Sequence, residues 1–212
     1  INPRCIMVHA ASGIERIADI GDLTMALSQR PAFSHYLKKK YPFPGVKLVP
    51  YPGNVTQFLM DPNFAQQAYI FSEPFVARKQ GADPRALLVS DTGFNPYASV
   101  LIATEKTVAD RRELVEAVVQ ATAEGWQIYL DNPGRTNHHI HQLNPEMGLD
   151  ILEYGARESR ALVLDEVAVA HGIGQMSAER WQTLQAQMIE AELITPGAVD
   201  PIRAFTTEFL ER

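Results

Sequence analysis

The stretch that decides the fold is Asp61–Tyr97, DPNFAQQAYIFSEPFVARKQGADPRALLVSDTGFNPY. Its Ala68–Phe71 run is apolar and aromatic, which is typical of a buried strand. Pro74 suits the first turn of a helix, because the N–H that proline lacks would have no partner there. The following Phe75–Gln80 is predicted to be that helix, and Gly81 is its stop. The stretch therefore predicts a buried strand followed directly by a helix.

Glu73 lies between this strand and this helix, next to Ser72. In open α/β sheets, ligand-binding groups gather at the carboxyl ends of the strands, beside helix N-termini. A carboxylate at such a point can accept hydrogen bonds from amino and ring N–H groups of a ligand. It can equally stand at the surface and favour its helix N-terminus electrostatically. We predict Ser72 and Glu73 as ligand contacts, with the surface role as the alternative for Glu73.

Composition and charge exclude several classes of protein. The 212 residues are 46% hydrophobic and 21% charged, as in an ordinary globular protein with a sizeable core. The net charge of −6 argues against a nucleic-acid partner, which needs a basic face. Cys5 is the one cysteine, so an internal disulfide and a multi-cysteine metal site are excluded, and its apolar neighbours predict a buried thiol. No stretch has the roughly 18 to 20 apolar residues of a membrane span.

Strand and helix signals alternate from Leu23 onward, which predicts a mostly parallel sheet with helices on its faces. Further strands are expected at Arg4–His9, Leu23–Leu27, Val46–Tyr51, Ala86–Ser90 and Tyr97–Thr104. Helices are expected at Pro31–Tyr41, Val55–Met60, Thr107–Leu130, Arg135–Gln142, Pro145–Glu158, Ser177–Glu192 and Pro201–Leu210, the third of them opened by a capping box at Thr107–Asp110. An α/β lobe would thus span residues 21–96, and a helix-rich part would span residues 97–212 with residues 1–20 joined to it.

Five segments in the same order carry a resemblance to a known family. They are Val8–Ile14, Val49–Asn54, Gln66–Phe75, Gly93–Tyr97 and Gly174–Trp181. Together they resemble periplasmic solute-binding proteins of bacterial ABC importers, of the nitrate/sulfonate/taurine and thiamine-pyrimidine type, which includes proteins for riboflavin and pyrimidine precursors.

The resemblance implies a type II periplasmic-binding-protein-like clamp of two α/β lobes. Residues 21–96 would be the second lobe, and residues 1–20 and 97–212 the remainder of the first, with the N-terminal part of that lobe missing before Ile1. Arg4–His9 and Tyr97–Thr104 would be the hinge segments. A first-lobe face left exposed in this way could be covered by a second copy, giving a dimer.

The predicted ligand site gathers at strand-to-helix junctions of the second lobe. The loop Ser28, Gln29, Arg30 would suit a carboxylate, sulfonate or phosphate, or it is an ordinary loop with an exposed arginine. Asn54 either caps its own helix or faces the cleft, and the two roles are compatible. Tyr97 is a candidate because it adjoins the hinge. By contrast, Tyr69, Phe71 and Phe94 are interpreted as core residues.

The resemblance implies an extracytoplasmic protein, periplasmic or membrane-anchored, that delivers a small solute to an ABC permease in the inner membrane. The solute would be pyrimidine-like and heteroaromatic, favoured by Glu73, or anionic and sulfonate-like, favoured by Arg30. No catalytic residue, metal or cofactor is predicted. His138 and His141 could share a helical face, but no acidic residue or cysteine stands at matching spacing.

Two alternatives remain open. One is an enzyme like the fungal thiamine-pyrimidine synthase, which uses histidine and iron on this fold. The cysteine-rich motif of that family has no counterpart here, where Cys5 stands alone. The other alternative is a ligand-sensing module.

Overall fold

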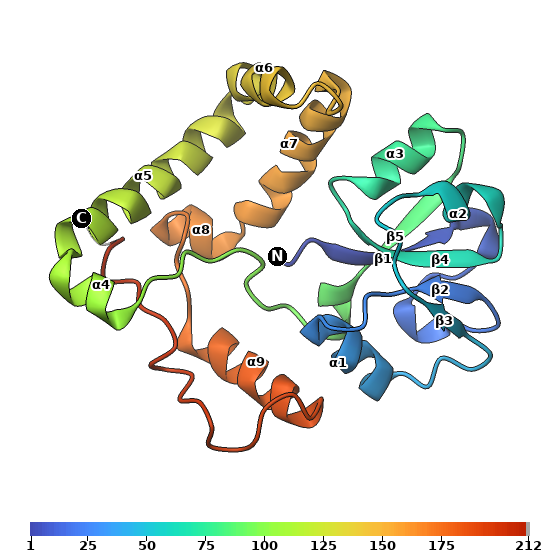
Figure 1. Ribbon diagram of the computed structural model, residues 1–212, viewed down its shortest axis with the longest axis horizontal. Helices are drawn as coiled ribbons and strands as arrows, with labels where there is room; N and C mark the ends of the chain where they lie inside the picture. The colour runs from blue at the N-terminus through green and yellow to red at the C-terminus, as the bar shows by residue number, and fades with distance from the viewer. Residues whose placement is uncertain (211–212) are drawn as a thin grey trace.

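The computed structural model describes residues 1–210. A five-stranded sheet forms one side of the molecule (Figure 1). Its strands are β1 (Arg4–His9), β2 (Thr24–Ala26), β3 (Lys47–Val49), β4 (Phe64–Tyr69) and β5 (Pro84–Leu88), in the order β3-β2-β4-β1-β5. The α/β class predicted from the sequence is confirmed.

The sheet is mixed rather than simply parallel. β2 pairs in parallel with β3 and β4, as the alternation of strands and helices predicts. β1 pairs antiparallel with β4 on one side and with β5 on the other. The first residues of β1 pair with the last residues of β4 and β5, so β1 runs in the opposite direction to both. β1 comes from residues 1–20, which were expected with the helix-rich part, yet it lies inside this sheet.

Both faces of the sheet are covered by helices. Successive side chains of a strand point to opposite faces, so β1 supplies Ile6 and Val8 to one core cluster and Met7 to the other. Helix α1 (Ala32–Lys40) covers the first face, and α2 (Thr56–Met60) and α3 (Glu73–Lys79) contribute to the second. This double coverage explains why β1 is a continuous apolar run instead of an alternating one.

The other side of the molecule is helical. It contains α4 (Glu105–Asp110), α5 (Arg112–Asp131), α6 (Gly134–Leu143), α7 (Leu149–Val163), α8 (Glu166–His171) and α9 (Ala178–Glu190). α5 and α7 contact each other and α6 connects them at one end (Figure 1). α9 packs on α1 and α7 packs on α3, and these contacts join the helical side to the sheet. Single 3-10 turns lie at η1 (Ala10–Ser12), η2 (Ile17–Asp19) and η3 (Val89–Thr92).

Several predicted helix boundaries are wrong. The capping residue is Thr104, whose hydroxyl accepts the Thr107 N–H at 3.1 Å, so the helix begins earlier than the predicted capping box. The chain departs from helical geometry at Arg111 (φ −134, ψ 42), which divides the predicted long helix into α4 and α5. Residues 201–210 form turns instead of a helix, and α8 was not predicted.

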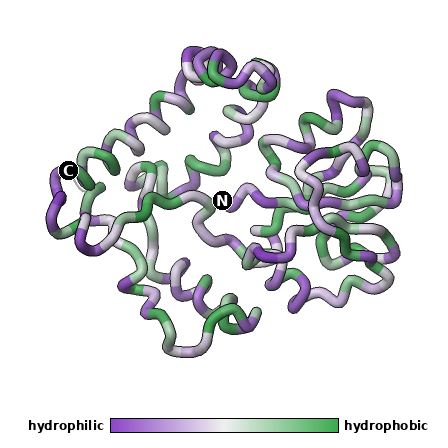
Figure 2. Tube along the Cα trace, in the orientation of Figure 1, coloured by the Kyte–Doolittle hydropathy of each residue, from purple (hydrophilic) through white to green (hydrophobic). Residues whose placement is uncertain are grey.

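The predicted strand Tyr97–Thr104 is also wrong. The segment carries no strand or helix assignment and crosses from the sheet to α4. A strand needs a neighbour that pairs with its backbone, and none is present for this segment within residues 1–210. Figure 2 shows the segment as hydrophobic, and Val100, Leu101 and Ile102 are 45%, 57% and 90% exposed.

In the described part of the chain, no helix combines the length and the apolar character needed to cross a bilayer.

Two turns beside the sheet interlock through Gly45. This residue has φ +66, and a Cβ added to it would lie 2.0 Å from Asp22 Oδ1. Gly53 has a similar φ of +78, but a Cβ there would meet nothing within 4 Å. An alanine at either position would therefore be strained in its backbone, but only an alanine at Gly45 would also clash with Asp22.

We predict that Gly45→Ala lowers the free energy of unfolding by about 3 kcal/mol, because clash adds to left-handed strain. Gly53→Ala is the control and should cost only about 1 kcal/mol from the backbone strain. Urea unfolding followed by circular dichroism measures both. Equal losses in the two variants would show that the Asp22 contact is unimportant.

Candidate functional site

The register between β1 and β4 brings a cation and aromatic rings together at one end of the strands. β4 ends there and β1 begins there, and Arg4 is paired directly opposite Tyr69. The Arg4 guanidinium carbon lies 4.8 Å from the Tyr69 ring centroid and 4.6 Å from that of Phe33 on α1. Phe71 stacks on Tyr69 at 5.3 Å with 9° between the ring planes. We call Phe33, Arg4, Tyr69 and Phe71 the aromatic stack.

The aromatic stack faces a large cavity between the sheet and the helical side. The cavity has a volume of about 1650 Å³ and is lined by the stack, by Ser72 and Tyr97, and by apolar side chains of α5, α7 and the 97–104 segment. Small-molecule sites usually measure about 300 to 1,000 Å³. The cavity exceeds that range, so a small solute would fill only part of it. The part beside the stack is the one that combines rings, a charge and polar groups.

Arg4 is a cation without a protein anion. Within residues 1–210 no carboxylate lies within salt-bridge distance of its guanidinium, and no side-chain hydrogen bond involves that group. Its two neighbours are ring faces, which attract a cation through their quadrupoles. Ring faces take none of the five guanidinium N–H donors in a linear hydrogen bond. Arg4 is half-buried, and these donors remain available toward the cavity.

A second cluster joins the sheet to the helical side at the point where the chain crosses between them. The Arg180 guanidinium on α9 donates to Asn95 O at 2.6 Å, to Asn95 Oδ1 at 3.0 Å and to Pro96 O at 3.3 Å, and it lies 4.0 Å from the Tyr97 ring centroid. The Asn2 N–H donates to the same Asn95 Oδ1 at 2.8 Å. Arg180 therefore holds the segment after β5, and Asn95 Oδ1 links that segment to Asn2 just before β1.

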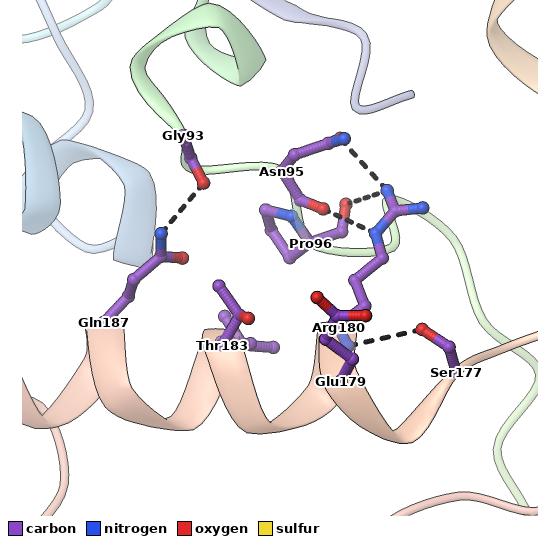
Figure 3. A pocket seen from close by; sticks show the side chains of 9 residues that line it. Gly93, Asn95, Pro96, Ser177, Glu179, Arg180, Thr183 and Gln187 are labelled. Carbon is purple, nitrogen blue, oxygen red and sulfur yellow. Dashed lines mark hydrogen bonds between the residues drawn. The ribbon is translucent and has the colours of Figure 1, made fainter.

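A pocket of about 220 Å³ lies along this junction (Figure 3). In the figure, Arg180 reaches from α9 to Asn95 and Pro96, while Gln187 donates to Gly93 O at 2.8 Å. The side chains of Arg180, Asn95 and Gln187 that line it form hydrogen bonds within the protein. We therefore interpret the pocket as part of the joint between the sheet and α9.

Glu73 makes two hydrogen bonds inside the protein. Tyr51 Oη donates to Glu73 Oε1 at 2.6 Å, and the Tyr69 N–H donates to Glu73 Oε2 at 2.8 Å. Burial, and then the hydrogen bond to this carboxylate, raises the pKa of Tyr51 well above its usual range. Glu73 thus ties the segment after β3 to the end of β4. Its role as a ligand contact stays a prediction, and it is not among the residues that line the large cavity.

Of the other predicted ligand residues, some line the large cavity and some do not. The Ser28 N–H donates to Gln67 Oε1 at 2.7 Å, and Gln29 and Arg30 are exposed on the same loop. Asn54 Oδ1 accepts the Thr56 N–H at 3.0 Å, so Asn54 supports the start of α2. None of these four residues lines the large cavity. Two of the predicted residues, Ser72 and Tyr97, do line it, and the structure brings them together with the aromatic stack.

Sequence reasoning missed the aromatic stack. Phe94 is buried as interpreted, but Tyr69 and Phe71 are half-exposed and line the cavity. Arg4 was passed over because only the register across two distant strands places it beside Tyr69. A signal was present, since an arginine at the first position of an otherwise apolar strand must leave the core at that strand's end.

The remaining reactive groups lie elsewhere. Cys5 is fully buried, as predicted, and burial raises the pKa of its thiol. His138 Nδ1 lies 2.8 Å from Gly134 O, and His141 Nδ1 lies 2.8 Å from Met147 O. In the part of the chain that the structure describes, no three histidine, cysteine, aspartate or glutamate residues group as a metal site would require.

Comparison with known proteins gives the chain relatives. A family model described as NMT1/THI5 like matches residues 1–136. The riboflavin-binding protein RibY of Chloroflexus aurantiacus is 30% identical over 145 residues, which are 67% of this chain and 41% of RibY. The structure of the periplasmic sulfonate-binding protein SsuA from Methylobacillus flagellatus KT matches with a TM-score of 0.60 at 13% identity.

The matches cover different shares of this chain and of its relatives. The SsuA match covers 98% of this chain and 64% of SsuA, and at that identity it concerns the fold. The chain spans less than half the length of RibY and less than two thirds of the SsuA chain.

We predict that Glu73→Ala lowers the free energy of unfolding by about 2 kcal/mol, because it leaves the half-buried Tyr51 hydroxyl and the Tyr69 N–H without an acceptor. Glu124→Ala is the control: Glu124 is exposed on α5, and its removal should change stability by less than about 0.5 kcal/mol. Thermal unfolding measures both variants. If Glu73→Ala were as stable as the control, the tie between β3 and β4 would contribute little.

Proposed function

The chain belongs to the NMT1/THI5-like family, and on that premise we propose that it is part of an extracytoplasmic solute-binding protein of an ABC importer. Its partners would be a small solute and a permease in the inner membrane. The SsuA-like fold and the RibY match support this proposal, because both relatives are named as binding proteins.

The observation that carries the proposal is the aromatic stack beside the cavity. Tyr69 and Phe71 present half-exposed rings that are nearly parallel, at 9° to each other. Stacking with flat rings is the interaction such a surface offers most readily. We therefore propose a flat heteroaromatic solute rather than a small sulfonate. RibY, named as a riboflavin-binding protein, supports this choice at 30% identity.

Closure would work by a shift of population. A ligand that contacts the aromatic stack on one side and the helical side on the other binds better when the two sides are close, so its differential affinity stabilises the closed state. The joint at Arg180 and Asn95 links the segment after β5 to α9 and to Asn2 just before β1. Rotation in the segments next to this joint would bring the sides together.

The chemistry at the cavity favours binding over catalysis. The aromatic stack supplies ring faces and one cation, which orient a ligand without transferring a proton or forming a covalent bond. The enzyme and sensing alternatives find no specific support in these residues.

We expect the full-length natural protein to quench riboflavin fluorescence on binding, and to bind taurine at least about 100-fold more weakly, since taurine has no ring to stack. Tyr69→Leu and Phe71→Leu keep apolar volume but lose the ring, and should weaken riboflavin binding about 10-fold each. Tyr41→Leu is the matched control, because Tyr41 directly follows α1 and does not line the large cavity, and the affinity of this variant should stay unchanged. Tight taurine binding without riboflavin binding would overturn the heteroaromatic assignment.

We also propose that a second copy covers the apolar cavity wall when the 212-residue chain is alone. Ile102 is 90% exposed and Val118 and Trp126 are 47% and 37% exposed, which is unusual for neighbouring large apolar side chains. Multi-angle light scattering should give a dimer mass, and Ile102→Asp should shift it toward the monomer. A monomer mass for the unchanged chain at high concentration would end this proposal.

A further inference from the structure

The Arg4 guanidinium lies between the ring faces of Phe33 and Tyr69 and forms no ion pair with a carboxylate of the described residues. A cation in a half-buried position normally has a carboxylate partner or reaches bulk water. Arg4 has ring neighbours at 4.6 and 4.8 Å instead, and no carboxylate within reach in the described residues. The ring faces hold the plane of the guanidinium and leave its N–H edge free.

We propose that Arg4 binds an anionic oxygen group carried by the ligand, so that the solute is a flat ring bearing a carboxylate, sulfonate or phosphate. This inference rests on the proposed binding function and adds the charge of the solute to it. A guanidinium edge matches two oxygens of such a group in a bidentate arrangement. Tyr69 lies between Arg4 and Phe71, so the ring of the solute would stack on the outer face of Phe71 while its anionic group reaches the N–H edge of Arg4.

The surroundings of Arg4 favour this role over that of structural support. The Arg4 backbone is already fixed by its pairing with Tyr69 and by the bond from its N–H to Asn2 Oδ1 at 3.1 Å. The strand start therefore does not need the guanidinium to hold it. Glu73, which accepts the N–H of the Tyr69 that pairs with Arg4, also accepts from Tyr51 and forms no ion pair with Arg4.

Arg4 and Arg30, the arginine predicted from the sequence, are alternative contacts for the anionic group of the solute. Arg30 is exposed on its loop and is not among the residues that line the large cavity, whereas Arg4 lines it. If the anion binds at the aromatic stack, Arg4 is the contact while the ring of the solute stacks on Phe71. If the anion binds at the start of α1, Arg30 is the contact.

The experiment compares riboflavin with riboflavin 5′-phosphate on the full-length natural protein by fluorescence titration. We expect the phosphate to bind roughly 10- to 100-fold more tightly, as a charge-assisted hydrogen-bonded pair would give. Arg4→Gln should remove this advantage, so that the ratio of the two affinities falls to about one. Arg135→Gln, an exposed arginine on α6, is the matched control and should keep the full advantage.

Other outcomes overturn the inference. Equal binding of the two ligands to the unchanged protein, or an equal loss for both in Arg4→Gln, would make Arg4 a purely structural member of the stack. Loss of the advantage in Arg30→Gln but not in Arg4→Gln would move the anion to the α1 loop. If neither ligand binds the unchanged protein, the proposed function fails and this inference fails with it. Thermal unfolding of each variant ensures that a lost affinity is not a lost fold.

Discussion

The antiparallel insertion of β1 between β4 and β5 is the constraint on which the rest of the structure depends. β1 is the one strand of the described sheet that runs against the others, so it begins where they end. Its middle residues are buried on both faces, which fixes its register, because a shift by one residue would exchange the two faces. That register sets Arg4 opposite Tyr69. A packing requirement in the core thus determines which side chains meet at the cavity.

Two polar networks stabilise the end of the sheet at which β1 begins and β4 and β5 finish. Glu73 joins the segment after β3 to β4, and Arg180 joins α9 to the segment after β5, whose Asn95 also accepts the Asn2 N–H. Both use an ionised group with several hydrogen bonds, which is the stronger kind. Glu73 accepts the N–H of Tyr69, so the aromatic stack rests on a fixed base.

Much of the fold could be predicted because its signals are local. The burial of β1, the presence of Pro74 in the first turn of α3 and the order of strands and helices all follow from neighbouring residues. The strand before α3 was predicted at Ala68–Phe71, but β4 begins at Phe64 and ends at Tyr69. The failures have a common cause in long-range pairing. Tyr97–Thr104 has a strand composition, but composition does not supply a neighbouring strand. Glu73 was correctly placed at a strand end, but its partners Tyr51 and Tyr69 come from two different strand ends and occupy both of its oxygens.

The charge of the chain as a whole and the charge at the cavity have opposite signs, and the local one matters for a bound solute. The net charge is −6, yet the cavity beside the aromatic stack contains an arginine with no carboxylate against it in the described residues. Surface charges are screened within about 10 Å at ordinary salt, whereas a half-buried charge is screened much less. Ring faces are also a poor substitute for water around a guanidinium, so part of its hydration is lost without a full replacement. An oxygen anion on a flat solute would restore those hydrogen bonds while its ring covers Phe71, and so the stack favours ligands that combine both features.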